Sequence, residues 1–237
     1  MNNFNLETCK YDFSSDTINI IILLYDISGS MESDVSAMRK ANKAFYEDFS
    51  RFEERGSIAI AKGVFANNFG MTSFNEVKNF NTSYEVGGGT ALYYAIVQSV
   101  NNTVKYYDEI VKRLNVRPRI TFLVFTDGDD NQSQNYRYDA RDAIKELNSL
   151  DATTVLVAFR DATRSGIGDD LGFSCVKNIH TVQELVSCLG NELSKSCKEQ
   201  SKSAYSLKSE FFSKADQNAE EDDTQNRAIM DDDFFNI

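Results

Sequence analysis

Three nearly continuous runs of apolar, mostly β-branched residues constrain this sequence more than any other feature. They lie at residues 18–25, 120–125 and 153–159. A run without alternating polar positions is typical of a strand that is covered on both faces, as in the centre of a parallel sheet. The three runs therefore predict a sheet with helices packed on both sides.

Segments with helical periodicity separate and follow these runs. Apolar residues recur every three or four positions in four segments: 35–52, 92–114, 140–147 and 182–193. The last segment begins with a capping box from Thr181 to Glu184, which predicts a helix start there and places His180 at the end of the preceding strand.

Two weaker strands are expected around the turn signal Asn67-Asn68. Residues 57–65 alternate loosely before this turn, and a short strand falls somewhere within 74–80 after it. A last short strand is expected at 175–179. Strands that alternate with helices predict an α/β fold with a doubly wound, mainly parallel sheet, in which the pair around the turn forms an edge hairpin.

The chain of 237 residues divides by composition into three parts. Residues 1–16 form an N-terminal extension, 17–195 hold the patterned segments, and 196–237 are expected to be a helical extension that grades into a disordered acidic tail. Residues 209–237 contain nine acidic and two basic residues, a net charge of −7 within a total of −11. Such a segment cannot bury enough apolar area to fold by itself.

The composition also excludes several kinds of protein. The net charge of −11 argues against general binding to nucleic acid or to an anionic membrane, because both surfaces are negative. The single histidine excludes metal sites that need two, and the four cysteines, without a CxxC pair, indicate reduced thiols. With neither a signal peptide nor a membrane-spanning run, we expect a cytoplasmic protein, bacterial or phage-encoded in a host cell.

Oxygen-bearing side chains follow two of the buried runs and a three-glycine loop. Five of them are candidate metal ligands: Asp26, Ser28, Ser30, Thr90 and Asp127. Each alone is typical of a helix cap or a turn, but the carboxyl ends of parallel strands share one edge of a sheet, where ligands bind. Because the ligands are all oxygens, the expected ion is Mg²⁺, with Mn²⁺ or Ca²⁺ as alternatives. The neighbouring Asp129 and Asp130 are expected to be solvated turn residues.

The order of these residues resembles a known site. Asp-x-Ser-x-Ser at 26–30, Thr90 in a GGGTAL loop and Asp127 in a TDG turn resemble the metal-ion-dependent adhesion site (MIDAS) of a von Willebrand factor A (vWA) domain. The resemblance covers about residues 17–193 and is nearest to small intracellular bacterial or phage versions, such as TerY-type proteins. It implies a Rossmann-like sheet of six strands with one antiparallel edge strand.

The resemblance also implies a role for each ligand. Ser28 and Ser30 would bind the ion through their hydroxyls, Asp26 and Asp127 mainly through water, and Thr90 directly or through water. An ion held mostly by neutral hydroxyls keeps an unquenched positive charge and attracts an external carboxylate. The implied function is a Mg²⁺-dependent protein-interaction module that binds an acidic residue of a partner in an intracellular assembly. The oligomeric state stays open.

An enzyme is not expected. A Mg²⁺-dependent phosphatase of the haloacid dehalogenase kind would need a second carboxylate at position 28, where this chain has Ser28. No nucleophile or base in the sequence is paired with the proposed ion.

The C-terminus adds a second candidate interaction site. Three acidic residues precede two aromatic ones: Asp231, Asp232, Asp233, Phe234 and Phe235. They loosely resemble the acidic-aromatic tips of single-stranded-DNA-binding proteins, which would make the chain a structural or replication-associated phage or bacterial protein. Two alternatives to a docking peptide stay open. The tail only keeps the protein solvated, or one of its carboxylates binds to the metal site of its own or a neighbouring copy.

Overall fold

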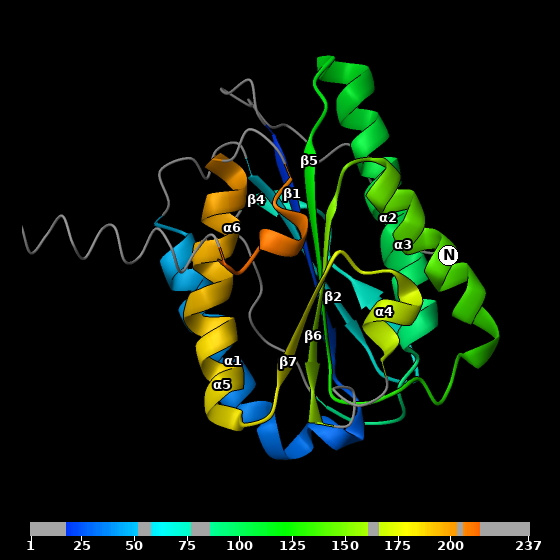
Figure 1. Cartoon of the computed structure of the whole chain (residues 1–237), viewed down its shortest axis with the longest axis vertical. Coiled ribbons are helices and arrows are strands. Elements are labelled where there is room, and N and C mark those ends of the chain that lie inside the picture. Colours follow the sequence, from blue (N-terminus) through cyan, green and yellow to red (C-terminus); the bar gives the residue numbers. More distant parts are fainter. Residues whose placement is uncertain (1–17, 52–57, 77–85, 161–165, 203–205, 214–237) are drawn as a thin grey trace, which may run out of the picture.

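The computed structural model describes residues 18–51, 58–76, 86–160, 166–202 and 206–213. One sheet runs through this part in the order β3-β2-β1-β5-β6-β7 (Figure 1). Its strands are β1 (Asn19–Asp26), β2 (Ile58–Phe65), β3 (Phe69–Met71), β4 (Asn75–Glu76), β5 (Arg119–Thr126), β6 (Thr153–Phe159) and β7 (Cys175–Ile179).

The four central pairings of the sheet are parallel, and only one edge is antiparallel. β2, β1, β5, β6 and β7 pair in parallel, while β3 and the short β4 both pair antiparallel with β2 and continue one edge row. This arrangement confirms the predicted six-strand, mainly parallel sheet with an antiparallel edge. The weak strand expected within 74–80 falls partly outside the described residues, because 77–80 are not described. The alternation of apolar residues did not predict β3.

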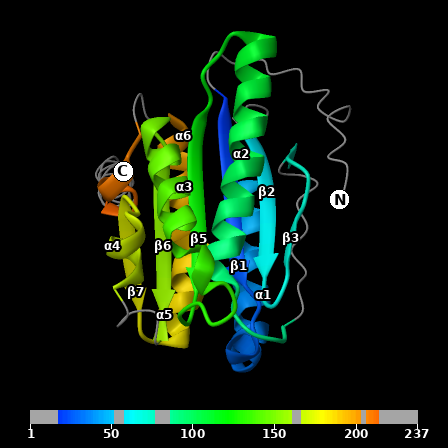
Figure 2. The same cartoon turned by 90° about the vertical axis from the view of Figure 1, so that its right-hand side faces the viewer.

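Helices cover both faces of the sheet. The α-helices are α1 (Val35–Phe49), α2 (Leu92–Leu114), α3 (Arg137–Ser149), α4 (Ile167–Leu171), α5 (Val182–Ser187) and α6 (Leu193–Lys202). Short 3-10 helices η2 (Gly29–Asp34), η5 (Gln134–Tyr136) and η8 (Lys208–Glu210) and a π-helical turn η7 (Cys188–Glu192) complete the fold. Figure 2 shows α2 and α3 on one side of the sheet and α1 and α5 on the other.

Burial on both faces explains the continuous apolar runs. In β1, Ile20, Ile22 and Leu24 belong to the core under α2 and α3, whereas Leu23 and Tyr25 belong to the core under α1. Because successive side chains of a strand point to opposite faces, no position of β1 is left for solvent. A polar residue on either face would cost the burial energy of the replaced side chain and leave an unpaired polar group.

The packed core continues beyond residue 195, where the sequence suggested a boundary. Cys197, Leu207 and Phe211 are buried in the core on the α1 side of the sheet. Within the described part of the chain, no helix is both long and apolar enough to cross a membrane.

At the carboxyl edge of the sheet, the chain leaves the neighbouring strands β1 and β5 in opposite directions. The chain leaves β1 through α1 toward β2 on one side, and it leaves β5 through α3 toward β6 on the other. The connections that leave the adjacent β1 and β5 therefore turn to opposite faces of the sheet. In open α/β sheets, this switch point is where ligands bind.

Candidate metal-binding site

Asp26 ends β1 beside Thr126, the last residue of β5. The Thr126 hydroxyl donates a hydrogen bond to Asp26 Oδ2 at 2.7 Å, and the backbone N–H of Ser28 donates to Asp26 Oδ1 at 2.8 Å. The carboxyl group is fully buried. Both of its oxygens are thus fixed at the switch point.

Hydrogen bonds between side chains link the first loop to the second. Ser30 Oγ donates to Asp127 Oδ1 at 2.8 Å, although the two residues are 97 positions apart. Ser28 Oγ lies 3.0 Å from Ser30 Oγ. The structure therefore brings four of the five predicted ligand residues into one cluster: Asp26, Ser28, Ser30 and Asp127.

The glycine loop approaches the same cluster through its backbone. Gly29 N–H donates to the Gly88 carbonyl at 2.9 Å, and Gly87 N–H donates to the Ile27 carbonyl at 2.8 Å. Gly88 has a φ of +83°, and a Cβ atom there would come within 2.8 Å of the Asn67 side chain, so glycine is needed for this approach. The glycine loop therefore lies against the turn that follows β1.

Thr90, the fifth predicted ligand, follows this loop and is buried. Its N–H donates to Asn131 Oδ1 at 2.8 Å, and its carbonyl accepts from Asn131 N–H at 3.0 Å. Asn131 therefore ties the loop of Thr90 to the loop that follows β5. Thr90 is thus tied to the loop after β5 through its backbone, whereas the other four residues are linked to one another by hydrogen bonds of their side chains.

Both carboxyl groups of the cluster are buried, and burial disfavours their charged forms. Burial raises the pKa of Asp26 to about 6, against the hydrogen bonds from Ser28 and Thr126, and the nearby charge of Asp127 raises it further. Burial also raises the pKa of Asp127, although the Ser30 hydrogen bond and the Arg160 charge oppose it. A cation at this point would relieve the cost of both negative charges.

The donor set fits a hard divalent cation. Within the described ranges, no three His, Cys, Asp or Glu side chains are grouped as a metal site. A bound ion would therefore depend on hydroxyl oxygens beside the two carboxylates, and oxygen donors are the ligands that Mg²⁺ prefers. When bound, Mg²⁺ would offer an open coordination position to an outside anion.

Arg160 is a charged neighbour that the sequence reasoning missed. It directly follows β6, where its guanidinium donates to the Ser30 carbonyl at 3.0 Å and to Ser33 Oγ at 2.8 Å. It also forms an ion pair with Asp34 and lies 3.6 Å from Asp127 Oδ2. The signal was available, because Arg160 follows the third buried run and so falls at the same edge of the sheet.

Replacing Arg160 by methionine should destabilise the metal-free protein by about 2 kcal/mol, because Asp34 is buried and would lose the partner of its charge. Arg137→Met is the matched control, since the Arg137–Asp170 pair is exposed to solvent and its loss should leave the stability almost unchanged. Urea unfolding in EDTA measures both variants. Equal losses would show that the Arg160 pair contributes no more than a surface pair.

Asp130 corrects the expectation that residues 129 and 130 are solvated turn residues. Asp129 is exposed, but Asp130 is 3% exposed. Its carboxylate accepts hydrogen bonds from Tyr93 N–H at 2.9 Å, from Ser133 N–H at 2.6 Å and from the Ser133 hydroxyl. Asp130 therefore caps the N-terminus of α2 from a distant loop.

The remaining predicted residues fall in two groups. His180 lies between β7 and the Thr181 cap as expected, and its N–H donates to Glu184 Oε2 at 2.8 Å while Glu184 N–H donates to Thr181 Oγ1 at 3.2 Å. The acidic-aromatic residues lie outside the described residues: Asp231, Asp232, Asp233, Phe234 and Phe235.

Comparisons with known proteins show similarity at the level of structure. No protein-family model matches the sequence, and no curated protein matches it significantly. The pilus adhesin SpaC from Lactobacillus rhamnosus GG matches with a TM-score of 0.60 and 11% identity, over 78% of this chain and 31% of SpaC. A von Willebrand factor type A protein from Catenulispora acidiphila matches with a TM-score of 0.54 and 15% identity, over 76% and 42%. The ArnB paralog VWA2 from Sulfolobus acidocaldarius matches with a TM-score of 0.50 and 16% identity, over 74% and 45%.

These similarities define the class of fold. The chain has a vWA-like, Rossmann-like α/β fold, as the motif predicted. It spans less than half the length of each of the three proteins.

Proposed function

We propose that this protein is a Mg²⁺-dependent protein-interaction module with a MIDAS-type site. In this proposal, Ser28 and Ser30 hold the ion through their hydroxyls, Asp26 and Asp127 act through water, and Thr90 completes the set. The ion then binds an Asp or Glu side chain of a protein partner. Mn²⁺ or Ca²⁺ would occupy the same oxygen ligands.

One observation carries the proposal most directly. The 2.8 Å hydrogen bond from Ser30 Oγ to Asp127 Oδ1, with Ser28 Oγ 3.0 Å from Ser30 Oγ, gathers three oxygen donors at the switch point of the sheet. The buried charge of Asp26 beside them favours a cation. A helix cap or turn would explain one such residue, but it does not explain a cluster drawn from two strand ends.

Binding rather than catalysis is proposed for this site. Burial raises the pKa of the Cys188 thiol to about 12 and raises those of Cys175 and Cys197 as well, so these thiols stay protonated at neutral pH and are poor nucleophiles. The hydroxyls and carboxylates at the switch point bond to one another, and we assign them to the ion.

Metal-dependent capture of a partner tests the proposal. The 237-residue chain is immobilised and exposed to a lysate, with Mg²⁺ or with EDTA, beside the Asp26→Ala variant. We expect at least one partner to be retained only by the wild type in Mg²⁺, and calorimetry should show Mg²⁺ uptake by the wild type alone.

Asp129→Ala is the control for this experiment, because Asp129 is exposed and makes no part of the proposed ligand set. It should retain both the ion and the partner. Capture that is indifferent to EDTA and to Asp26→Ala, or calorimetry without Mg²⁺ uptake, would refute the MIDAS function.

A further inference from the structure

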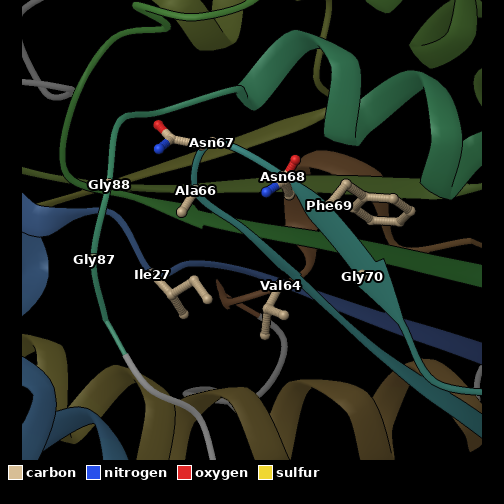
Figure 3. Close-up of a pocket in the computed structure, with 9 residues that line it drawn as sticks. All are labelled: Ile27, Val64, Ala66, Asn67, Asn68, Phe69, Gly70, Gly87 and Gly88. Carbon is tan, nitrogen blue, oxygen red and sulfur yellow. The ribbon is translucent and has the colours of Figure 1, made fainter.

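An uncharged pocket of about 390 Å³ adjoins the candidate metal site. Figure 3 shows Ile27 and Val64 between the glycine loop and the turn from β2 to β3. The Phe69 ring packs against the core on the other face of the sheet, whereas Asn67 and Asn68 line the pocket at the turn. The pocket thus has the size and the apolar surface to receive a side chain such as phenylalanine.

The pocket shares its wall with the metal site. Ile27 stands between Asp26 and Ser28 in the sequence, and its carbonyl accepts a hydrogen bond from Gly87, another lining residue. Gly88 lines the pocket and also holds Gly29 of the first loop. A single short peptide could therefore place a carboxylate at the ion and a neighbouring apolar side chain in the pocket.

The charge at this edge of the sheet makes such a peptide dependent on the ion. Asp34 and Asp127 lie beside Arg160, and Asp26 lies at the same edge beside Thr126, so three carboxylates face one guanidinium there. Their combined negative charge repels an acidic peptide. A bound divalent ion cancels this net negative charge and offers a cation to a carboxylate, so an acidic peptide would dock only when the metal is present.

The C-terminal residues of this chain combine the two features that such a peptide needs, a carboxylate and a neighbouring apolar side chain. Asp231, Asp232 and Asp233 stand directly before Phe234 and Phe235. The last described residue is Ser213, so residues 214–230 join the fold to this motif. Seventeen extended residues span up to about 60 Å, whereas a domain of this size has a radius of gyration of only about 17 Å. The motif can therefore reach the site of its own chain.

We propose that the C-terminal motif 231–235 docks on the metal site of its own chain, with a carboxylate on the ion and a phenylalanine ring in the pocket. The inference rests on the proposed function. Because the motif is tethered, its effective concentration at the site is about millimolar, and an external acidic partner must compete with it. The tail would thus set the threshold for partner binding.

Tryptophan fluorescence tests the docking, because the sequence contains no tryptophan. Phe234→Trp and Phe235→Trp, each in the 237-residue chain, introduce a single reporter at the motif. We expect the emission of at least one variant to shift to shorter wavelength in Mg²⁺, to become less accessible to a soluble quencher, and to revert in EDTA. The shift should not depend on protein concentration.

Gly70→Val, combined with each reporter, tests the pocket. A Cβ atom at Gly70 would lie 4.0 Å from Val64 Cγ2, so valine partly fills the pocket without a clash and suits an edge strand. The Mg²⁺-induced shift should disappear while calorimetry still detects Mg²⁺ binding. A shift that persists would overturn the assignment of the ring to this pocket.

A pair of charge-matched variants tests the carboxylates. Asp231→Asn/Asp232→Asn/Asp233→Asn should weaken Mg²⁺ binding about 3- to 10-fold, because docking of the tail and binding of the ion stabilise one another. Glu220→Gln/Glu221→Gln/Asp222→Asn removes three charges from the same tail and should change Mg²⁺ binding by less than about 2-fold. Equal effects would mean that only the general charge of the tail matters.

The outcomes separate this inference from the proposed function. Mg²⁺ uptake without a fluorescence shift in either reporter overturns tail docking and leaves the metal site standing. A shift that grows with protein concentration assigns the motif to a second copy and overturns docking within one chain. An absence of Mg²⁺ uptake in the wild type overturns the proposed function and the docking together.

Discussion

The Asp26→Asn variant should lose Mg²⁺ binding and, in EDTA at pH 7.5, have a free energy of unfolding up to about 3 kcal/mol higher than the wild type. The carboxyl group of Asp26 is fully buried, and its pKa rises from 3.8 to about 6. Each pKa unit corresponds to about 1.4 kcal/mol, so the charged form costs about 3 kcal/mol in the metal-free protein.

The amide of the variant fits the site because its hydrogen-bonding neighbours can adapt. The oxygen of the amide can still accept from Ser28 N–H, as Asp26 Oδ1 does. The Thr126 hydroxyl, which lies 2.9 Å from the Gly128 carbonyl, can donate there and accept from the new NH₂ group. The substitution therefore removes the buried charge without leaving an unpaired polar group.

The sign of the effect can be checked by its dependence on pH. Well below the unfolded pKa of 3.8, Asp26 is protonated in both states and adds no pH dependence. Between pH 4 and pH 6 the unfolded state ionises first, so the stability of the metal-free wild type falls as pH rises. Above the folded pKa of about 6 the loss is complete. Stability measured against pH in EDTA should show this fall in the wild type and a smaller one in the variant, where Asp127, whose pKa is also raised, still ionises.

Asp129→Asn is the matched control, because Asp129 is exposed in the same loop region as Asp127. It should leave both the Mg²⁺ affinity and the metal-free stability nearly unchanged. If Asp26→Asn lowered the metal-free stability, the buried charge would be stabilising as it stands, and the physical argument for a cation would be lost.

Asp130→Ala should destabilise the protein by about 3 kcal/mol, the largest loss expected at this edge of the sheet. The carboxylate accepts hydrogen bonds from Tyr93 N–H, from Gln132 N–H at 3.0 Å and from both donors of Ser133. Alanine would leave these donors without their acceptor in a buried place, and α2 would lose its cap.

Asp129→Ala provides the comparison, since the neighbouring residue has the same chemistry but is exposed. Its effect should stay within about 0.5 kcal/mol. Urea denaturation monitored by circular dichroism measures both variants. Similar small effects for the two would show that the loop rearranges and that Asp130 is dispensable for the start of α2.

Much of the fold followed from local patterns, because the patterns were produced by burial. The runs that became β1, β5 and β6 are almost entirely apolar because helices cover both faces of the sheet. The capping box at Thr181 and Glu184 also formed as predicted, because its partners are three residues apart. A structural element can therefore be predicted from the sequence when its contacts join residues close in the chain, or when all its residues are buried.

Asp130, Arg160 and the strand β3 were missed or misjudged for the opposite reason. Asp130 caps a helix that begins 38 residues earlier, as its bond to Tyr93 N–H shows. Arg160 contacts Ser30 and Ser33 from another strand end. The three residues of β3 carry too short a pattern to be recognised, and their pairing with β2 defines them.

The sequence by itself determined the class of fold and the order of the candidate ligands. Burial on both faces of a sheet produces runs of apolar residues, and polar residues follow these runs where the strands end. The tertiary structure alone decided which charges surround the ligands, which carboxylate is buried as a cap, and that an uncharged pocket adjoins the site. These features depend on side chains that come from strands and loops far apart in the chain. Their meeting is fixed by the strand order, and no local pattern records it.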